Sequence, residues 1–177
     1  EGFRCVNERH GEVFLAMTLE PGYNCRGYCW VSEARVEAVH DTGASRNSID
    51  KDFLKALVND QRTCDAVVGI HDCEPLKCRG LKGPPIIVNK VAVVNVTFRE
   101  AGLKKAFTRE LGFAVVDGST EDMLIGKPTL DRLGFVSDKH SIELRAEGIR
   151  YPTVLPYETK DARADETFLR LADHESV

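Results

Sequence analysis

The chain has 177 residues, of which 42% are hydrophobic and 29% charged, and its formal net charge is -4 with an isoelectric point near 5.8. A chain of this length can bury a hydrophobic core without disulfides or metal ions to stabilise it. The chain is mildly acidic and has no concentrated basic stretch, which argues against a nucleic-acid partner. Apolar runs such as Val91–Val94 are far shorter than the roughly 20 residues of a membrane span, so we expect no membrane partner. We expect one domain at 1–155 and a mobile acidic tail at 156–177.

The N-terminal third predicts two strands and one short helix. Residues 13–19 alternate between the two faces of a strand, residues 21–30 are rich in turn formers, and residues 36–40 form a second strand that ends at Asp41. Asp50 is placed to cap a helix whose apolar face consists of Phe53, Leu54 and Leu57.

The middle of the chain predicts a hairpin and two further strands. Residues 66–70 and 76–81 flank the polar stretch 71–74, which favours a projecting hairpin. Residues 86–98 and 111–116 are rich in β-branched and apolar side chains, and a basic connector separates them. Both are predicted strands.

The C-terminal third predicts one short helix and one more strand. The apolar run 123–126 leads into a helix that begins near Pro128 and ends before Gly134, which follows the usual asymmetry of helix ends. Residues 141–145 offer only two apolar side chains, so we expect an edge or interface strand.

The triplet Asp41-Thr42-Gly43 follows the second predicted strand and has the composition of half an aspartic-protease site. Peptide hydrolysis of this kind needs two carboxylates that share one proton, because two like charges about 3 Å apart cannot both ionise. The sequence contains no second Asp-Thr-Gly or Asp-Ser-Gly. A second copy of the chain must therefore supply the other aspartate. Taken alone, the triplet is also ordinary turn chemistry.

Two ordered motifs resemble the retropepsin family, and especially the proteases of long-terminal-repeat retrotransposons. The stretch 41–49, Asp-Thr-Gly-Ala-Ser-Arg-Asn-Ser-Ile, resembles the family's active-site loop. The stretch 124–134, Leu-Ile-Gly-Lys-Pro-Thr-Leu-Asp-Arg-Leu-Gly, resembles its second hallmark, an apolar pair and a glycine before a short helix. The resemblance implies an all-β, closed-barrel acid-protease fold with one short helix towards the C-terminus. Each chain would be half of a homodimeric aspartic endopeptidase that cleaves peptide or polyprotein substrates.

The resemblance also implies a role for each residue of the site. Asp41 is the expected catalytic residue, Thr42 the clamp between the two chains, and Gly43 the residue whose amide donates to the carboxylate. Ala44 and Ser45 are expected to form a wall of the substrate cleft. The predicted hairpin gives a substrate-binding flap with the candidate residues Gly69, Ile70, His71 and Asp72, although an ordinary surface hairpin is equally compatible with these residues.

Two positions depart from the family pattern. Pro128 stands where the family has Asp or Asn, which removes a polar link beneath the active loop. His40 replaces the aliphatic residue before the aspartate, and by alternation it points into the interior with Val36 and Ala38. We expect a neutral, hydrogen-bonded core histidine. The alternative is that its charging at mildly acidic pH shifts the dyad or loosens the dimer.

The remaining expectations concern cofactors, location and a rival function. The six cysteines lack a zinc spacing, and in a chain of this size free thiols are expected, so neither a metal nor another cofactor is predicted. The protein is expected inside the cell, in the cytoplasm or in a retroelement particle. The rival interpretation is a catalytically silent module of the same fold that dimerises or binds peptides.

Overall fold

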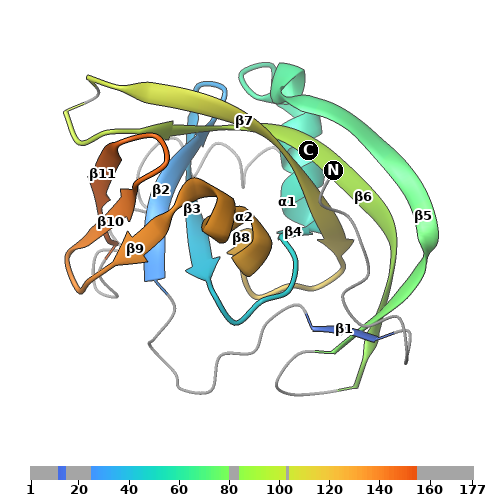
Figure 1. Cartoon of the computed structure of the whole chain (residues 1–177). Helices are drawn as coiled ribbons and strands as arrows, with labels where there is room; N and C mark the ends of the chain where they lie inside the picture. Colours follow the sequence, from blue (N-terminus) through green and yellow to red (C-terminus); the bar gives the residue numbers. More distant parts are fainter. Residues whose placement is uncertain (1–11, 15–24, 80–83, 103, 155–177) are drawn as a thin grey trace.

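The computed structural model describes residues 12–14, 25–79, 84–102 and 104–154. Within these ranges the chain is mostly β, with two α-helices and one 3-10 turn (Figure 1). Most of the predicted strand 13–19, the tail 156–177 and Cys5 lie outside the described residues. The strands are β1 (Glu12–Phe14), β2 (Cys25–Val31), β3 (Ala34–Asp41), β4 (Ser48–Asp50), β5 (Val67–Arg79), β6 (Ile86–Arg99), β7 (Ala106–Val116), β8 (Met123–Gly126), β9 (Phe135–Ser137), β10 (Ser141–Leu144) and β11 (Ile149–Pro152).

Eight of the described strands form one sheet in the order β1-β5-β6-β2-β3-β8-β4-β7, and β6 also pairs with β7. The strand β6 pairs with β5 through residues 86–94 and with β7 through residues 91–99, so that residues 91–94 have a neighbouring strand on both edges. It meets β2 at one position, Trp30 opposite Thr97. The pairings therefore run from β6 through β2, β3, β8, β4 and β7 and return to β6. The expectation of an all-β fold is confirmed at this level.

The turn-rich segment predicted up to Trp30 is wrong, because residues 25–31 form β2. Alternate residues Cys29 and Val31 are fully buried, and the strand pairs with β3 over its whole length. Gly27 fits where a Cβ would lie 2.7 Å from Ile142 and 2.9 Å from Tyr151. The glycine is thus a packing requirement within a strand, although from the sequence it resembles a turn signal.

The hairpin predicted around residues 71–74 is also wrong. Residues 67–79 form one continuous strand, β5, which pairs antiparallel with β6 and shifts register between Asp72 and Leu76. The polar residues that imitate a turn lie on a largely exposed part of this strand, where no core contact demands apolar side chains. The observed antiparallel pair is β5–β6, and Cys78 opposite Ile86 is the last pair of its register.

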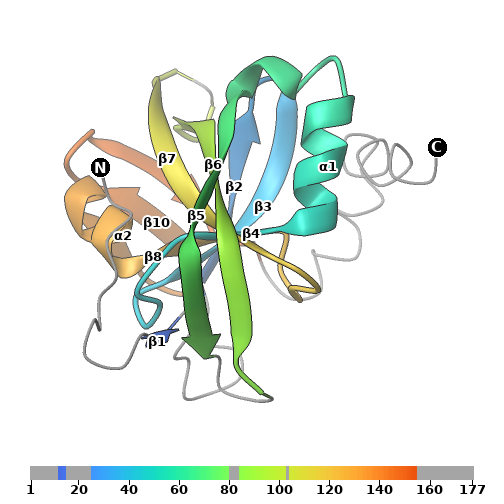
Figure 2. The same ribbon diagram turned by 90° about the vertical axis from the view of Figure 1, so that its right-hand side faces the viewer.

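Both predicted helices are confirmed. Helix α1 (Lys51–Asn59) begins after Asp50, whose carboxylate accepts the Phe53 N–H at 3.1 Å, and it buries Phe53, Leu54 and Leu57. Helix α2 (Lys127–Leu133) has Pro128 in its first turn and ends at Gly134, which has a left-handed φ of 67°. Figure 2 shows the two helices on opposite sides of the sheet.

The strand predicted at 141–145 is confirmed as β10, but it is not an edge. It lies between β9 and β11 in a three-stranded antiparallel sheet, and its apolar residues Ile142 and Leu144 are fully buried. Their side chains join the same hydrophobic cluster as β2, β3, β6 and α1. One core therefore spans both sheets within the described residues.

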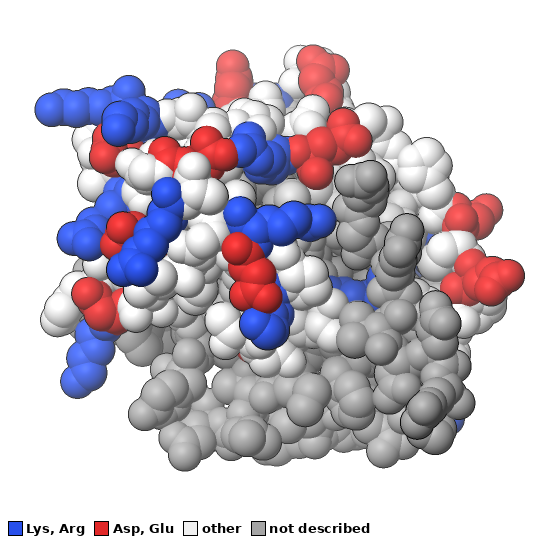
Figure 3. Space-filling model, in the orientation of Figure 1, with Lys and Arg blue, Asp and Glu red and all other residues white. Residues whose placement is uncertain are grey.

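Lysine, arginine and acidic side chains are intermixed over the face shown in Figure 3. Among the described residues, neither helix has the length and apolar composition needed to cross a bilayer. The described part of the chain also holds no group of three acidic, histidine or cysteine side chains that could bind a metal ion. Its five cysteines, Cys25, Cys29, Cys64, Cys73 and Cys78, are free thiols.

Candidate active site

The fold brings the two sequence motifs side by side. Strands β3 and β8 are parallel neighbours, so that Asp41 pairs with Gly126 at the end of both strands. After Asp41 the chain loops away and returns as β4, which pairs with the other edge of β8. Residues about 80 positions apart in the sequence thus form one compact structure at the carboxyl ends of two strands. Figure 1 shows the β3–β4 loop at the lower end of the molecule.

The Asp41 carboxylate is held by its own loop. The Gly43 N–H donates a hydrogen bond of 2.8 Å to Oδ1 of Asp41, as the sequence predicts. Further along the loop, the Ala44 N–H donates to the Asp41 carbonyl. The Asp41 residue is only 4% exposed. This geometry fixes a carboxylate at the end of a strand, held by a backbone donor of its own loop.

Gly126 allows the β3–β4 loop to pass directly over β8. A Cβ at this position would lie 2.6 Å from the Arg46 carbonyl oxygen and 3.0 Å from that of Ala44. The Lys127 N–H then donates to the Ala44 carbonyl at 2.8 Å. The glycine of the second motif is therefore required by the first motif, because any side chain would push the loop away.

Asn47 is the polar link between the loop and the elements beneath it. Its Oδ1 accepts the Gly126 N–H at 2.8 Å, and its Nδ2 donates to the Gly112 carbonyl and to Oγ1 of Thr129 at 3.1 and 3.0 Å. Both Asn47 and Thr129 are buried. Although Pro128 takes the position of an acidic or amide residue, Thr129 provides a polar link beneath the loop one residue later.

The other loop residues have different surroundings. Thr42 is exposed, which leaves its hydroxyl available for contact outside the chain, and Ser45 is partly exposed. Ala44 is buried in a small cluster with Val39 and Leu124. Its side chain supports the base of the loop in this chain, and its role as a cleft wall stays a prediction, as do those of Thr42 and Ser45.

The four flap candidates lie within β5 and not at a hairpin tip. Ile70 faces a groove beside α1, and none of residues 41–45 lines that groove. Asp72 is 86% exposed and pairs with Lys90 at 2.6 Å, while Gly69 and His71 lie in the same strand. Cys73 follows Asp72 in β5. Burial raises the pKa of its thiol, and the positive charge of Arg46 opposes this effect.

His40 points into the core, as the alternation predicts. Its Nδ1 lies 3.0 Å from the Ala38 carbonyl, and its Nε2 lies 2.8 Å from the Tyr151 hydroxyl. Because a carbonyl oxygen only accepts, Nδ1 carries the proton and Nε2 accepts from Tyr151. Burial lowers the pKa of His40 to about 4 and raises that of Tyr151. Burial thus favours the neutral ring over the alternative of a charged ring at mildly acidic pH.

The sequence alone did not predict the residues that hold the site in place, which are Asn47, Thr129 and Tyr151. Asn47 lies in the stretch 41–49 that resembles the retropepsin loop, so its position in the sequence could have indicated a structural role. Its three hydrogen bonds could not be predicted, because they depend on the fold. Thr129 and Tyr151 carry no such signal, because they follow the aspartate by 88 and 110 positions in the sequence. Thr129 and Tyr151 reach the site only because β8 pairs with β3 and because β11 packs into the core.

No family model and no curated protein matches this sequence. Among solved structures, the fold is similar to the crystal structure of the retroviral protease-like domain of Ddi1 from Leishmania major. The TM-score is 0.46 and the sequence identity 16%, over 76% of this chain and 96% of that chain. A likeness of this degree assigns no activity to the chain.

Proposed function

We propose that this chain is half of a retropepsin-like aspartic endopeptidase with a closed-barrel fold, which cleaves extended polypeptides as a homodimer. The observation that carries the proposal is the meeting of both motifs at one point, with Asp41 opposite Gly126 and bonded to the Gly43 amide. The chain supplies one such carboxylate, and the chemistry requires two. A two-fold axis through the β3–β4 loops of two copies meets this requirement.

The proposed reaction is a general acid–base attack by water. One Asp41 carboxylate is ionised and takes a proton from the water, while its protonated mate donates to the carbonyl oxygen of the scissile bond. Neither a covalent intermediate nor a metal takes part. The exposed Thr42 hydroxyl is placed to bond the loop of the other chain and to keep the carboxylates in register.

The substrate is proposed to lie along the lower end of the molecule. There the β3–β4 loop and the β1-paired end of the β5–β6 hairpin lie at the same end in both views (Figures 1 and 2). We assign the substrate-covering role to this hairpin in place of residues 69–72. The resemblance of the loop to retrotransposon proteases makes a polyprotein of such an element, inside the cell, the proposed substrate.

The test is cleavage of a mixed peptide library by the wild-type chain and by Asp41→Asn. The variant keeps the shape of the side chain and removes its ionisation, so we expect no product above background and an unchanged thermal unfolding curve. Asp131→Asn, on the exposed face of α2, is the matched control and should cleave normally. Product formation by Asp41→Asn at the wild-type rate contradicts the assignment.

The silent-module alternative gives a different result in the same assay. A pepstatin-type transition-state analogue measures binding apart from turnover. The proposed enzyme binds it and forms products that the analogue suppresses. Binding by a wild-type dimer that yields no product from any library member supports the module and contradicts the enzyme.

A further inference from the structure

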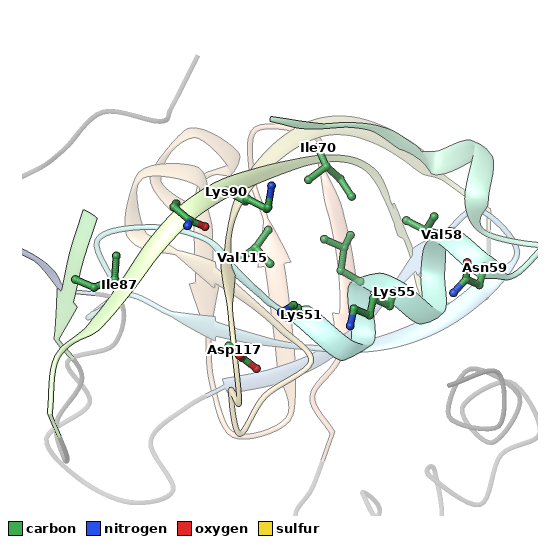
Figure 4. Close-up of a pocket in the computed structure, with 11 residues that line it drawn as sticks. Lys51, Lys55, Val58, Asn59, Ile70, Ile87, Lys90, Val115 and Asp117 are labelled. Atoms are coloured by element: carbon green, nitrogen blue, oxygen red, sulfur yellow. The ribbon is translucent and has the colours of Figure 1, made fainter. Parts of the chain in front are cut away.

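A groove lies between helix α1 and the β5–β6 hairpin, outside the candidate active site (Figure 4). Its volume is about 460 Å³. The residues that line it come from α1, from the hairpin and from the end of β7 and the residue after it: Lys51, Leu54, Lys55, Val58, Asn59, Ile70, Ile87, Asn89, Lys90, Val115 and Asp117. None of residues 41–45 is among them.

The groove combines an apolar floor with a basic rim. Three of the five large hydrophobic side chains that are exposed among the described residues line it, namely Val58, Ile70 and Ile87. Ile87 is 62% exposed. Such a concentration of apolar surface in a concave site is typical of a place where another segment binds.

The rim of the groove is positively charged. Lys51 and Lys55 stand one turn apart on α1, and Lys90 faces them from β6. Lys90 also pairs with Asp72, and Asp117 is the one acidic residue in the lining. Within the described part of the chain, no ion pair involves Lys51 or Lys55. The groove therefore favours an occupant with apolar side chains next to carboxylates.

We infer that the occupant is the chain's own segment 161–175. Its acidic residues Asp161, Asp165, Glu166, Asp173 and Glu175 surround the apolar residues Phe168, Leu169 and Leu171. The apolar side chains match the floor, and the carboxylates match the lysines on α1. Docking of this segment covers apolar surface that the described residues leave open, and it ties α1 to the hairpin.

The length of the chain allows this contact. The last described residue is Val154, and about eleven residues lead from it to Asp165. An extended chain of this length spans up to roughly 36 Å. A small domain is about 30 Å across. The part of segment 161–175 from Asp165 onwards can therefore reach the groove in the same molecule.

The inference does not depend on the proposed catalysis, since no residue of the Asp41 loop lines the groove and its readout is amide exchange; of the lining, Ile87 lies in the β1-paired end of the hairpin. The experiment uses the full chain with Asp41→Asn, so that self-cleavage cannot remove the segment. Amide hydrogen exchange is followed over residues 165–175 and over α1, with a free peptide of the sequence 161–177 as the reference. We expect exchange in the segment to be at least about tenfold slower in the chain than in the peptide.

Charge reversal then tests the lysines. Lys51→Glu with Lys55→Glu should return the segment to the exchange rate of the peptide, whereas adding Asp165→Lys and Glu166→Lys should restore the protection. Lys104→Glu with Lys105→Glu, on the exposed β6–β7 connection, is the matched control and should change nothing. Ile87→Asn, at a highly exposed position, should weaken the protection without affecting the fold.

Three outcomes overturn the inference. The first is a segment that exchanges at the peptide rate in the unaltered chain. The second is protection that survives both the lysine reversal and Ile87→Asn. The third is protection that increases with protein concentration, which assigns the groove to a segment of a second copy.

Discussion

At the scale of single residues, the site depends on side chains that the core fixes. Asp41 is the end of a strand whose preceding residue, His40, is locked between the Ala38 carbonyl and the Tyr151 hydroxyl. The ring also stacks on Phe135 with centroids 5.7 Å apart. An aliphatic residue would fill the same place without these bonds. His40 therefore links β3 to β9 and β11.

The buried His40 predicts that stability falls in acid. Its pKa is about 4 in the folded chain, against an ordinary value of 6.5, so the unfolded chain binds more protons between these pH values. The contribution to the free energy of unfolding is complete above pH 6.5 and is lost as the pH falls towards 4. Its size is about 3 kcal/mol.

Denaturant unfolding at several pH values checks this contribution. Tyr151→Phe retains the titrating ring, whereas Tyr151→Phe with His40→Leu removes it and leaves no unpaired hydroxyl. The single variant should lose more stability between pH 6.5 and 4 than the double variant. Equal losses in the two would show that His40 does not titrate in this range.

At the scale of elements, Asn47 connects three of them to the active loop. Its side chain bonds the backbone of β7 and β8 and the hydroxyl of Thr129 on α2. Because all of these groups are buried or partly buried, loss of the amide leaves several polar groups without partners, and each costs about 1–3 kcal/mol.

We therefore expect Asn47→Ala to lower the free energy of unfolding by about 3 kcal/mol or more, and Thr129→Val by about 1 kcal/mol. Asn47→Ala should also lower the cleavage rate, since Gly126 and the loop over it lose their tie. Urea unfolding gives both free energies, and Asn89→Ala on the exposed face of β6 is the matched control. Equal stability of Asn47→Ala and Asn89→Ala would contradict this role.

Local patterns in the sequence predicted the elements whose apolar residues are regularly spaced or whose ends have a clear capping residue. Asp50 and the apolar face of α1 are local, and so are Pro128 and Gly134 at the ends of α2. The predictions failed where a local signal had a tertiary cause. Gly27 serves packing against Tyr151, and the polar middle of β5 is exposed strand, but both imitate turns. The hydrogen bonds of Asn47 depend on strand order, which no local pattern contains.

At the scale of the whole molecule, one hydrophobic cluster unites both sheets and helix α1 within the described residues. This core presents the β3–β4 loop at one end, with Thr42 exposed beside the buried Asp41. A single chain carries one carboxylate in that position. The proposed chemistry therefore predicts that cleavage requires two Asp41 side chains, one from each chain of a dimer. A monomeric enzyme would not show this requirement.

The most direct measurement mixes wild-type and Asp41→Asn chains under conditions of subunit exchange and records the cleavage rate per wild-type chain. If two Asp41 side chains form the site, random pairing in an equal mixture leaves about half of that rate, because each mixed dimer has one ionisable carboxylate. A larger excess of the variant lowers the rate per wild-type chain in proportion to the fraction of all chains that are wild type. A rate per wild-type chain that stays constant at every ratio would contradict the account.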